Sequence, residues 1–195
     1  MKDKNLYIIA GCNGAGKTTA SYTILPEILD CKEFVNADEI AKGLSPFQPE
    51  KVSFEAGRIM LHRIDELLQK EADFAFETTL SAKSYISIVK KAQSQGHFVT
   101  LVFFWLNSTE LAKQRVLIRV SEGGHSIPED VIERRYVRGI KNFFKIYLNA
   151  CDNVMLFDNS NKSPVLILEK EISEESVIIK EDLFNEIKKI QHDKR

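Results

Sequence analysis

The chain has 195 residues, of which 44% are apolar and 28% are charged, and its 27 basic side chains nearly balance its 28 acidic ones. This composition is typical of a globular protein, and we expect a single domain over residues 1–195 that is not a dedicated nucleic-acid binder. The sequence has no apolar stretch long enough to cross a membrane, no apolar signal region at its start and no paired spacing among its three cysteines. We therefore expect a cytoplasmic protein without a membrane partner.

Strand-like and helix-like segments alternate along the chain, which is typical of an α/β fold with a parallel sheet. The predicted core strands cover residues 6–10, 34–36, 74–76, 99–106 and 154–157. The predicted helices cover residues 17–29, 49–70, 82–95, 109–120, 128–149 and 182–191. The pattern weakens in a C-terminal extension of about residues 162–195, where 165–168 and 177–179 are expected to form a hairpin.

A glycine-rich run follows the first predicted strand and matches the phosphate-binding loop G-x-x-x-x-G-K-[ST] at every fixed position. Glycines let successive backbone amides converge on an anion, and the lysine adds positive charge for the β- and γ-phosphates. The hydroxyl that follows the lysine is the usual Mg²⁺ ligand, here Thr18. The sequence therefore predicts a nucleoside triphosphate site formed by Gly11, Asn13, Gly14, Ala15, Gly16, Lys17, Thr18 and Thr19.

Two acidic residues, Asp38 and Glu39, follow the second predicted strand after a single alanine, Ala37. In a parallel sheet the carboxyl ends of the strands face the bound nucleotide. Asp38 is thus expected either to accept a proton from a substrate hydroxyl or to hold Mg²⁺ through water. The alternative is a helix N-cap at Asp38, and the two roles can coexist.

The third predicted strand is followed by Glu77, Thr78, Thr79 and Ser81. A carboxylate with three hydroxyls at a strand end could bind a polyhydroxyl acceptor. We predict that Glu77, Thr78 and Thr79 contact such a substrate. The alternative is a capping cluster for the helix that follows.

A glycine-containing segment at about residues 121–128, between two predicted helices, lies where P-loop kinases of small molecules carry their lid. Arg115 and Arg119 are four residues apart and share a helix face before it, and Arg134 and Arg135 follow it. Guanidinium groups suit phosphate oxygens. We predict that Arg115, Arg119 and Arg135 act with Lys17 in catalysis and that Arg134 binds substrate; the alternative is an exposed helix with scattered salt bridges.

Four segments together resemble the zeta-toxin-like branch of P-loop kinases: Gly11–Thr19, residues 34–41, residues 76–81 and the lid region from Arg119 to Pro128. Their spacing matches over roughly residues 5–160. The resemblance implies a parallel five-stranded core sheet of order 2-3-1-4-5, sandwiched by helices, with a helical lid. It also implies Mg²⁺ and ATP, or alternatively GTP, as phosphoryl donor.

The same resemblance implies phosphorylation of a small molecule, namely a hydroxyl of a UDP-amino-sugar such as UDP-N-acetylglucosamine. Asp38 would be the base, Lys17 and Thr18 would serve the donor, Glu77 and Thr79 would contact the acceptor, and arginines beside the lid would hold the transferred phosphate. A toxin of this kind would be expected to have a small antitoxin protein as partner.

Two other functions stay open at this point. The first is a kinase acting on a nucleic-acid 5′-hydroxyl; a local excess of basic residues between 113 and 145 favours it, whereas the neutral overall charge and the lack of aromatic-basic interleaving count against it. The second is a P-loop ATPase that is not a kinase. Its ABC type would need a Leu-Ser-Gly-Gly-Gln-like signature, which residues 121–125 do not form.

Overall fold

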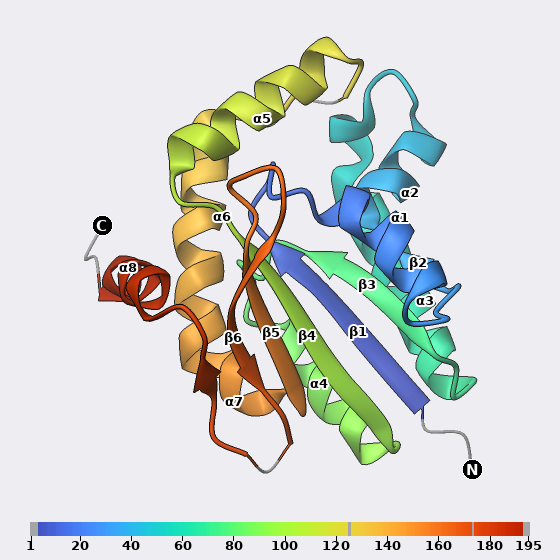
Figure 1. Cartoon of the computed structure of the whole chain (residues 1–195). Coiled ribbons are helices and arrows are strands. Elements are labelled where there is room, and N and C mark those ends of the chain that lie inside the picture. The colour runs from blue at the N-terminus through green and yellow to red at the C-terminus, as the bar shows by residue number, and fades with distance from the viewer. Residues whose placement is uncertain (1–3, 125, 173, 193–195) are drawn as a thin grey trace.

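A computed structural model describes residues 4–124, 126–172 and 174–192. These residues form one seven-stranded sheet of order β2-β3-β1-β4-β5-β6-β7 (Figure 1). The strands are β1 (Lys4–Gly11), β2 (Phe34–Val35), β3 (Phe74–Thr78), β4 (His97–Trp105), β5 (Asn153–Asp158), β6 (Val165–Lys170) and β7 (Val177–Ile178). The first five are parallel and have the predicted order 2-3-1-4-5. The last two add the predicted antiparallel hairpin.

The centre of the sheet is apolar because its strands are covered on both faces. In β4 every residue except Phe98 is buried. Beside it, β1 runs in register so that Leu6 pairs with Val99 and Gly11 with Phe104. This pairing fixes the end of β1, and with it the start of the phosphate-binding loop.

Helices surround the sheet, as the alternating pattern predicted. They are α1 (Lys17–Glu27), α2 (Ala37–Leu44), the 3₁₀ turn η1 (Pro49–Val52), α3 (Ser53–Gln69), α4 (Tyr85–Ser94), α5 (Thr109–Ser121), α6 (Glu129–Asn142), the π-helical η2 (Phe143–Tyr147), α7 (Leu148–Ala150) and α8 (Glu181–His192). In Figure 1, α5 crosses above the carboxyl ends of the strands, with α6 and α8 on the left and α2 and α3 on the right. None of the helices in the described ranges combines the length and apolar character needed to cross a bilayer.

Three helix predictions need correction. The helix expected from residue 82 begins only at Tyr85, because the chain first takes an irregular path in which Leu80 has a φ of 56°. The helix expected over 128–149 changes to π-helical geometry at Phe143. Finally, Asp38 is not a helix N-cap: α2 is capped by Asn36, whose side-chain oxygen accepts from the backbone N–H groups of Asp38 and Glu39.

Candidate active site

The phosphate-binding loop runs from the end of β1 into α1. At Gly11 a Cβ would lie only 2.2 Å from the carbonyl oxygen of Phe104. Gly16, with a φ of 81°, directly precedes α1 and turns the chain into it. The loop therefore lies at a helix N-terminus, where backbone amides and the helix dipole favour an anion.

The Lys17 side chain is 6% exposed and folds back over this loop. Its Nζ donates a hydrogen bond to the Cys12 carbonyl at 3.0 Å and lies 3.4 Å from a carboxylate oxygen of Glu77. These two contacts hold the Lys17 ammonium at the phosphate-binding loop.

Glu77, at the end of β3, lies beside the phosphate-binding loop. Its other carboxylate oxygen accepts from Thr18 Oγ1 at 2.8 Å and from Asn36 Nδ2 at 3.0 Å. The sequence-based prediction assigned Glu77 to the acceptor, yet each of these contacts ties it to donor-side residues or to the cap of α2. The signal that could have suggested this is the strand order, since β3 is the neighbour of β1.

Asp38 lies in the first turn of α2, at the same edge of the sheet. Its backbone is fixed by the cap, because Asp38 N donates to Asn36 Oδ1 at 2.8 Å. Asn36 also donates to Glu77. One buried side chain therefore sets the positions of both acidic residues.

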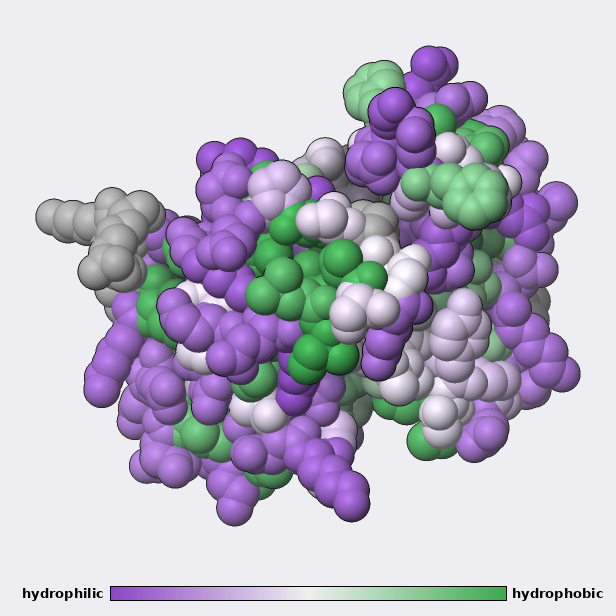
Figure 2. All heavy atoms as spheres, turned by 90° about the horizontal axis from the view of Figure 1, so that it is seen from above, coloured by the Kyte–Doolittle hydropathy of each residue, from purple (hydrophilic) through white to green (hydrophobic). Residues whose placement is uncertain are grey.

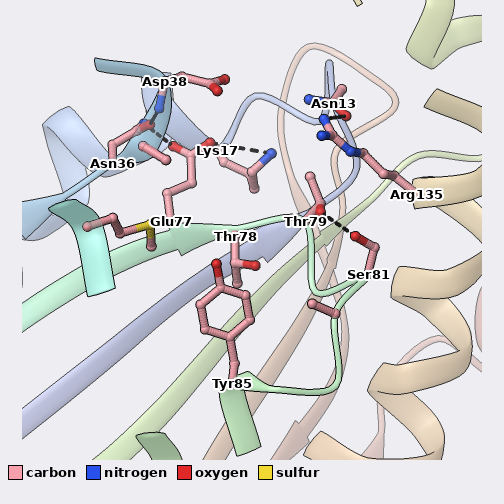
Figure 3. Close-up of a pocket in the computed structure, with 13 residues that line it drawn as sticks. Asn13, Lys17, Asn36, Asp38, Glu77, Thr78, Thr79, Ser81, Tyr85 and Arg135 are labelled. Atoms are coloured by element: carbon pink, nitrogen blue, oxygen red, sulfur yellow. Dashed lines mark hydrogen bonds and ion pairs between the residues drawn. The ribbon is translucent and has the colours of Figure 1, made fainter. Parts of the chain in front are cut away.

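Two cavities, each of about 250 Å³, meet at these residues. The donor-side cavity is lined by loop residues from Asn13 to Thr19 and by α5. The inner cavity is lined by residues that follow β2 and β3 and by Arg135 of α6 (Figure 3). Both cavities are lined by Asn13, Lys17, Asp38 and Glu77.

The loop after β3, which forms one wall of the inner cavity, is held by α6 and η2. Asn142 Nδ2 donates to the Leu80 carbonyl at 2.8 Å, and Tyr147 Oη donates to the Ala82 carbonyl at 3.0 Å. Within the loop, the hydroxyls of Thr79 and Ser81 lie 2.9 Å apart. Hydrogen bonds thus hold the loop that carries these hydroxyl groups.

Tyr85 also lines the inner cavity and was missed by the sequence analysis. Its ring stacks on Phe76 with centroids 5.4 Å apart, and burial raises the pKa of its phenol. In Figure 3 the ring points from the start of α4 toward Thr78. The irregular path of residues 79–84 brings it there, which helical periodicity alone could not indicate.

The four predicted arginines occupy different positions. Arg135 donates to Asn13 Oδ1 at 3.2 Å and lines the inner cavity; burial lowers the pKa of its guanidinium, and nearby Asp38 opposes this shift. Arg115 and Arg119 line the donor-side cavity. Arg134 is exposed and is not among the residues that line either cavity.

Arg115 is engaged by the loop that follows β5. Its guanidinium donates to the carbonyl oxygens of Asn159 at 2.8 Å and Ser160 at 2.9 Å. Asn159 in turn donates from Nδ2 to the Ala15 carbonyl at 2.7 Å. This arrangement joins α5 to the phosphate-binding loop, which suits a residue that positions the donor site.

The helices on either side of the proposed lid are tied together at their base. Lys113 of α5 lies 3.0 Å from Glu129 and 2.5 Å from Glu133 of α6. These ion pairs raise the pKa of Lys113. The charge of Lys113 is therefore paired within the fold. The predicted lid, residues 121–128, includes position 125, which lies outside the described residues.

Cys12, within the phosphate-binding loop, is 5% exposed. Burial raises the pKa of its thiol to about 11, although Lys17 nearby acts in the opposite direction. At neutral pH the side chain is thus a neutral thiol, which is poorly nucleophilic.

The chain matches the zeta toxin family over residues 1–171. An uncharacterized protein of Haemophilus influenzae is 30% identical to it over 136 residues, which are 70% of this chain and 94% of that protein.

Solved structures share the fold at low sequence identity. A structure of AvrRxo1-ORF1 with AvrRxo1-ORF2 and sulphate ions has a TM-score of 0.80 at 19% identity, covering 99% of this chain and 66% of the matched one. The corresponding structure with ATP has a TM-score of 0.77 at 19% identity over the same shares. The PezAT toxin–antitoxin system of Streptococcus pneumoniae gives 0.66 at 15% identity, over 97% of this chain and 86% of that one. The chain thus spans about two thirds of the AvrRxo1 chain that it matches.

Proposed function

We propose, from the premise that the chain belongs to the zeta toxin family of P-loop kinases, that it transfers the γ-phosphoryl group of ATP to a hydroxyl of a UDP-amino-sugar. The observation that carries this proposal is the meeting of two cavities at Lys17, Asp38 and Glu77. A kinase needs a donor site and an acceptor site that share the point of transfer.

The donor-side cavity suits a nucleoside triphosphate. Backbone amides at the start of α1 and the Lys17 ammonium would bind the phosphates. Arg119 lines this cavity from α5 and would contact the transferred phosphate, while Arg115 would hold the loop after β5 in place. ATP is the donor we propose, and GTP is the alternative that the assay below separates.

Two residues of the donor-side cavity, Thr18 and Glu77, also fit a magnesium ion. Thr18 Oγ1 and the Glu77 carboxylate lie 2.8 Å apart, and oxygen ligands of this kind suit Mg²⁺. Among the described residues there is no group of three or more His, Cys, Asp or Glu that could hold a metal alone. This agrees with an ion bound by one carboxylate and the nucleotide phosphates. When bound, Mg²⁺ would neutralise charge on the phosphates.

The inner cavity suits a hydroxylated acceptor. It is lined by hydroxyl groups of Thr78, Thr79, Ser81 and Tyr85. A sugar ring could exchange its hydration for these fixed donors and acceptors. Because Arg134 lies outside this wall, we assign it no contact with the sugar ring.

The proposed chemistry uses Asp38 as general base. The Asp38 carboxylate accepts the proton of the acceptor hydroxyl while that oxygen attacks the γ-phosphorus. The bond between the γ-phosphorus and the β–γ bridging oxygen breaks, and ADP leaves. Lys17 and Arg135 would stabilise the charge on the transferred group, and one such arginine contributes about 10³–10⁵ in rate.

A partner protein is part of the proposal. The AvrRxo1-ORF1 structure also contains AvrRxo1-ORF2, and PezAT is a toxin–antitoxin system. A small antitoxin that covers the nucleotide site would keep such a kinase inactive in the cytoplasm.

Release of the nucleoside diphosphate, ADP from ATP or GDP from GTP, tests the proposed function. The purified protein would be given Mg²⁺ and either ATP or GTP, with UDP-N-acetylglucosamine, N-acetylglucosamine or a 5′-hydroxyl oligonucleotide. We expect UDP-N-acetylglucosamine to stimulate release with ATP, and Asp38→Asn to abolish that stimulation. Turnover that none of the acceptors stimulates would overturn the kinase assignment, and stimulation by the oligonucleotide alone would assign a nucleic-acid kinase.

A further inference from the structure

Helix α6 contacts both of the loops that border the proposed point of transfer. Its Arg135 donates to Asn13 of the phosphate-binding loop at 3.2 Å, as a dashed line in Figure 3 marks. Its Asn142, seven residues further on, donates to the carbonyl of Leu80 in the loop after β3 at 2.8 Å. Residues seven apart lie close to the same face of an α-helix, which completes a turn about every 3.6 residues. One face of α6 therefore joins the phosphate-binding loop to the loop that we assign to the acceptor.

Gly139 lies between these two contacts, and its approach to the loop after β3 leaves no room for a side chain. A Cβ at this position would lie 2.7 Å from the carbonyl oxygen of Thr79. Glycine in the interior of a helix is unfavourable relative to alanine, so its use here needs a reason, and the close contact supplies one. By contrast, a Cβ at Gly57, inside α3, would meet nothing beyond its own helix within 4 Å.

The π-helical segment η2 extends the same face along the loop after β3. Tyr147, at its end, is fully buried and donates from Oη to the Ala82 carbonyl at 3.0 Å. In an α-helix Tyr147 would lie about 140° around the axis from Asn142, five residues earlier. The wider turn, in which the N–H of Leu148 donates to the carbonyl of Phe143, brings residues five apart nearly into line. The π turn thus lets both side chains reach one loop.

These contacts lie inside the molecule. Seen from above, the surface is mainly hydrophilic (Figure 2), whereas Gly139, Asn142 and Tyr147 are all buried. A buried carbonyl that loses its donor keeps the cost of its desolvation, because water does not replace the lost bond. The loop after β3 is therefore held against α6 and η2.

We propose that Gly139, Asn142 and Tyr147 are positioning residues, which set the loop after β3 at the distance from the phosphate-binding loop that transfer requires. Thr79 and Ser81 of that loop line the inner cavity, so a shift of the loop moves a bound acceptor relative to the γ-phosphate. A misplacement of about 1 Å can cost about 100-fold in rate. This inference rests on the proposed function in taking the loop as an acceptor contact. The three residues line neither cavity and take no part in the chemical step.

Two variants disturb the loop in different ways, and each has a matched control. Gly139→Ala places a methyl group against the loop, and Gly57→Ala adds the same group inside a helix where there is room. Tyr147→Phe removes one hydroxyl from the loop. Its control is Tyr136→Phe, because Tyr136 of α6 also donates to a backbone carbonyl, at 2.7 Å, and accepts from a tryptophan besides. The control should therefore cost at least as much stability.

Kinetics of ADP release with ATP and UDP-N-acetylglucosamine supply the first arm. Loss of one neutral hydrogen bond corresponds to a factor of about 2 to 12. We expect kcat/KM for the acceptor to fall by that factor in Tyr147→Phe and by about 100-fold in Gly139→Ala. KM for ATP, and the rate of ATP hydrolysis without acceptor, should stay within twofold of the parent. Both controls should keep kcat/KM for the acceptor within twofold, even where Tm falls.

Amide hydrogen exchange of the ligand-free protein tests the inference without turnover. Peptides that cover residues 79–84 should exchange about twofold faster or more in Gly139→Ala and Tyr147→Phe, and at the parent rate in the two controls. Unchanged exchange of this loop, or an equal loss of acceptor kcat/KM in the two tyrosine variants, would overturn the inference. If exchange speeds up as expected but the parent protein phosphorylates no acceptor, the positioning of the loop stands and the proposed function fails.

Discussion

Replacing Glu77 by glutamine should raise the Mg²⁺ concentration needed for half-maximal activity far more than the KM for the acceptor. The carboxylate accepts from Thr18 at 2.8 Å and from Asn36 at 3.0 Å, and Lys17 Nζ lies 3.4 Å from its second oxygen. The amide preserves the size of the side chain and removes its negative charge. What is lost is therefore electrostatic.

The expected magnitude follows from these contacts. A hydrogen bond to a charged group contributes about 1.5–3 kcal/mol. Since about 1.4 kcal/mol corresponds to a factor of ten, the Mg²⁺ concentration for half-maximal activity should rise about 10- to 150-fold. The buried Lys17 would also lose its counter-charge, and Tm without ligand should fall by about 2–4 °C for each kcal/mol lost.

The assay is ADP release against free Mg²⁺ at saturating ATP and acceptor, followed by acceptor titration at saturating Mg²⁺. Glu39→Gln is the matched control, because Glu39 lies in the same first turn of α2 as Asp38 but pairs with Lys42 and lines neither cavity. An unchanged Mg²⁺ requirement in Glu77→Gln, together with a tenfold higher acceptor KM, would refute this reasoning. Glu77 would then be an acceptor contact, as the sequence suggested.

Three further predictions concern the same site. Arg135→Gln should lower kcat by about 10³ in the ADP-release assay, because it removes a cation beside the point of transfer; a loss below tenfold would contradict this. Arg115→Lys keeps the charge but lacks the planar fork that donates to the two carbonyls from two nitrogens, so KM for ATP should rise about tenfold with kcat within twofold, and the reverse pattern would assign Arg115 to the chemistry. Burial raises the pKa of Cys12 from 9.0 to about 11, so the folded protein should lose stability as pH rises from about 9 to 11, where the unfolded chain releases this proton first. Denaturant titrations should find a smaller loss in Cys12→Ala, and an equal loss in both proteins would exclude Cys12 as its source.

Much of the fold could be predicted because its signals are local. The run from Gly11 to Thr18 specifies a strand, a tight loop and a helix N-terminus within a few residues, and the structure has these elements in that order. The near-continuous apolar run of β4 likewise indicated a strand covered on both faces, and the structure buries it.

The site was harder to predict because its contacts depend on sheet order and on irregular backbone. Glu77 meets Thr18 only because β3 pairs with β1, which no local pattern reveals. Tyr85 reaches the inner cavity through a loop in which Leu80 has a left-handed backbone, a conformation that nothing in its residue type indicates. The helix α2 was not among the predicted helices and was indicated only by the N-cap alternative at Asp38, because its eight residues are too few to establish a periodicity.

Phosphorus NMR tests the central claim most directly. The spectrum of the protein with Mg²⁺, ATP and UDP-N-acetylglucosamine should develop the signals of ADP and a new phosphomonoester, and Asp38→Asn should produce neither. ADP and free phosphate formed at the same rate with and without the sugar would contradict the account. The chain would then hydrolyse ATP without transferring its phosphoryl group to this acceptor.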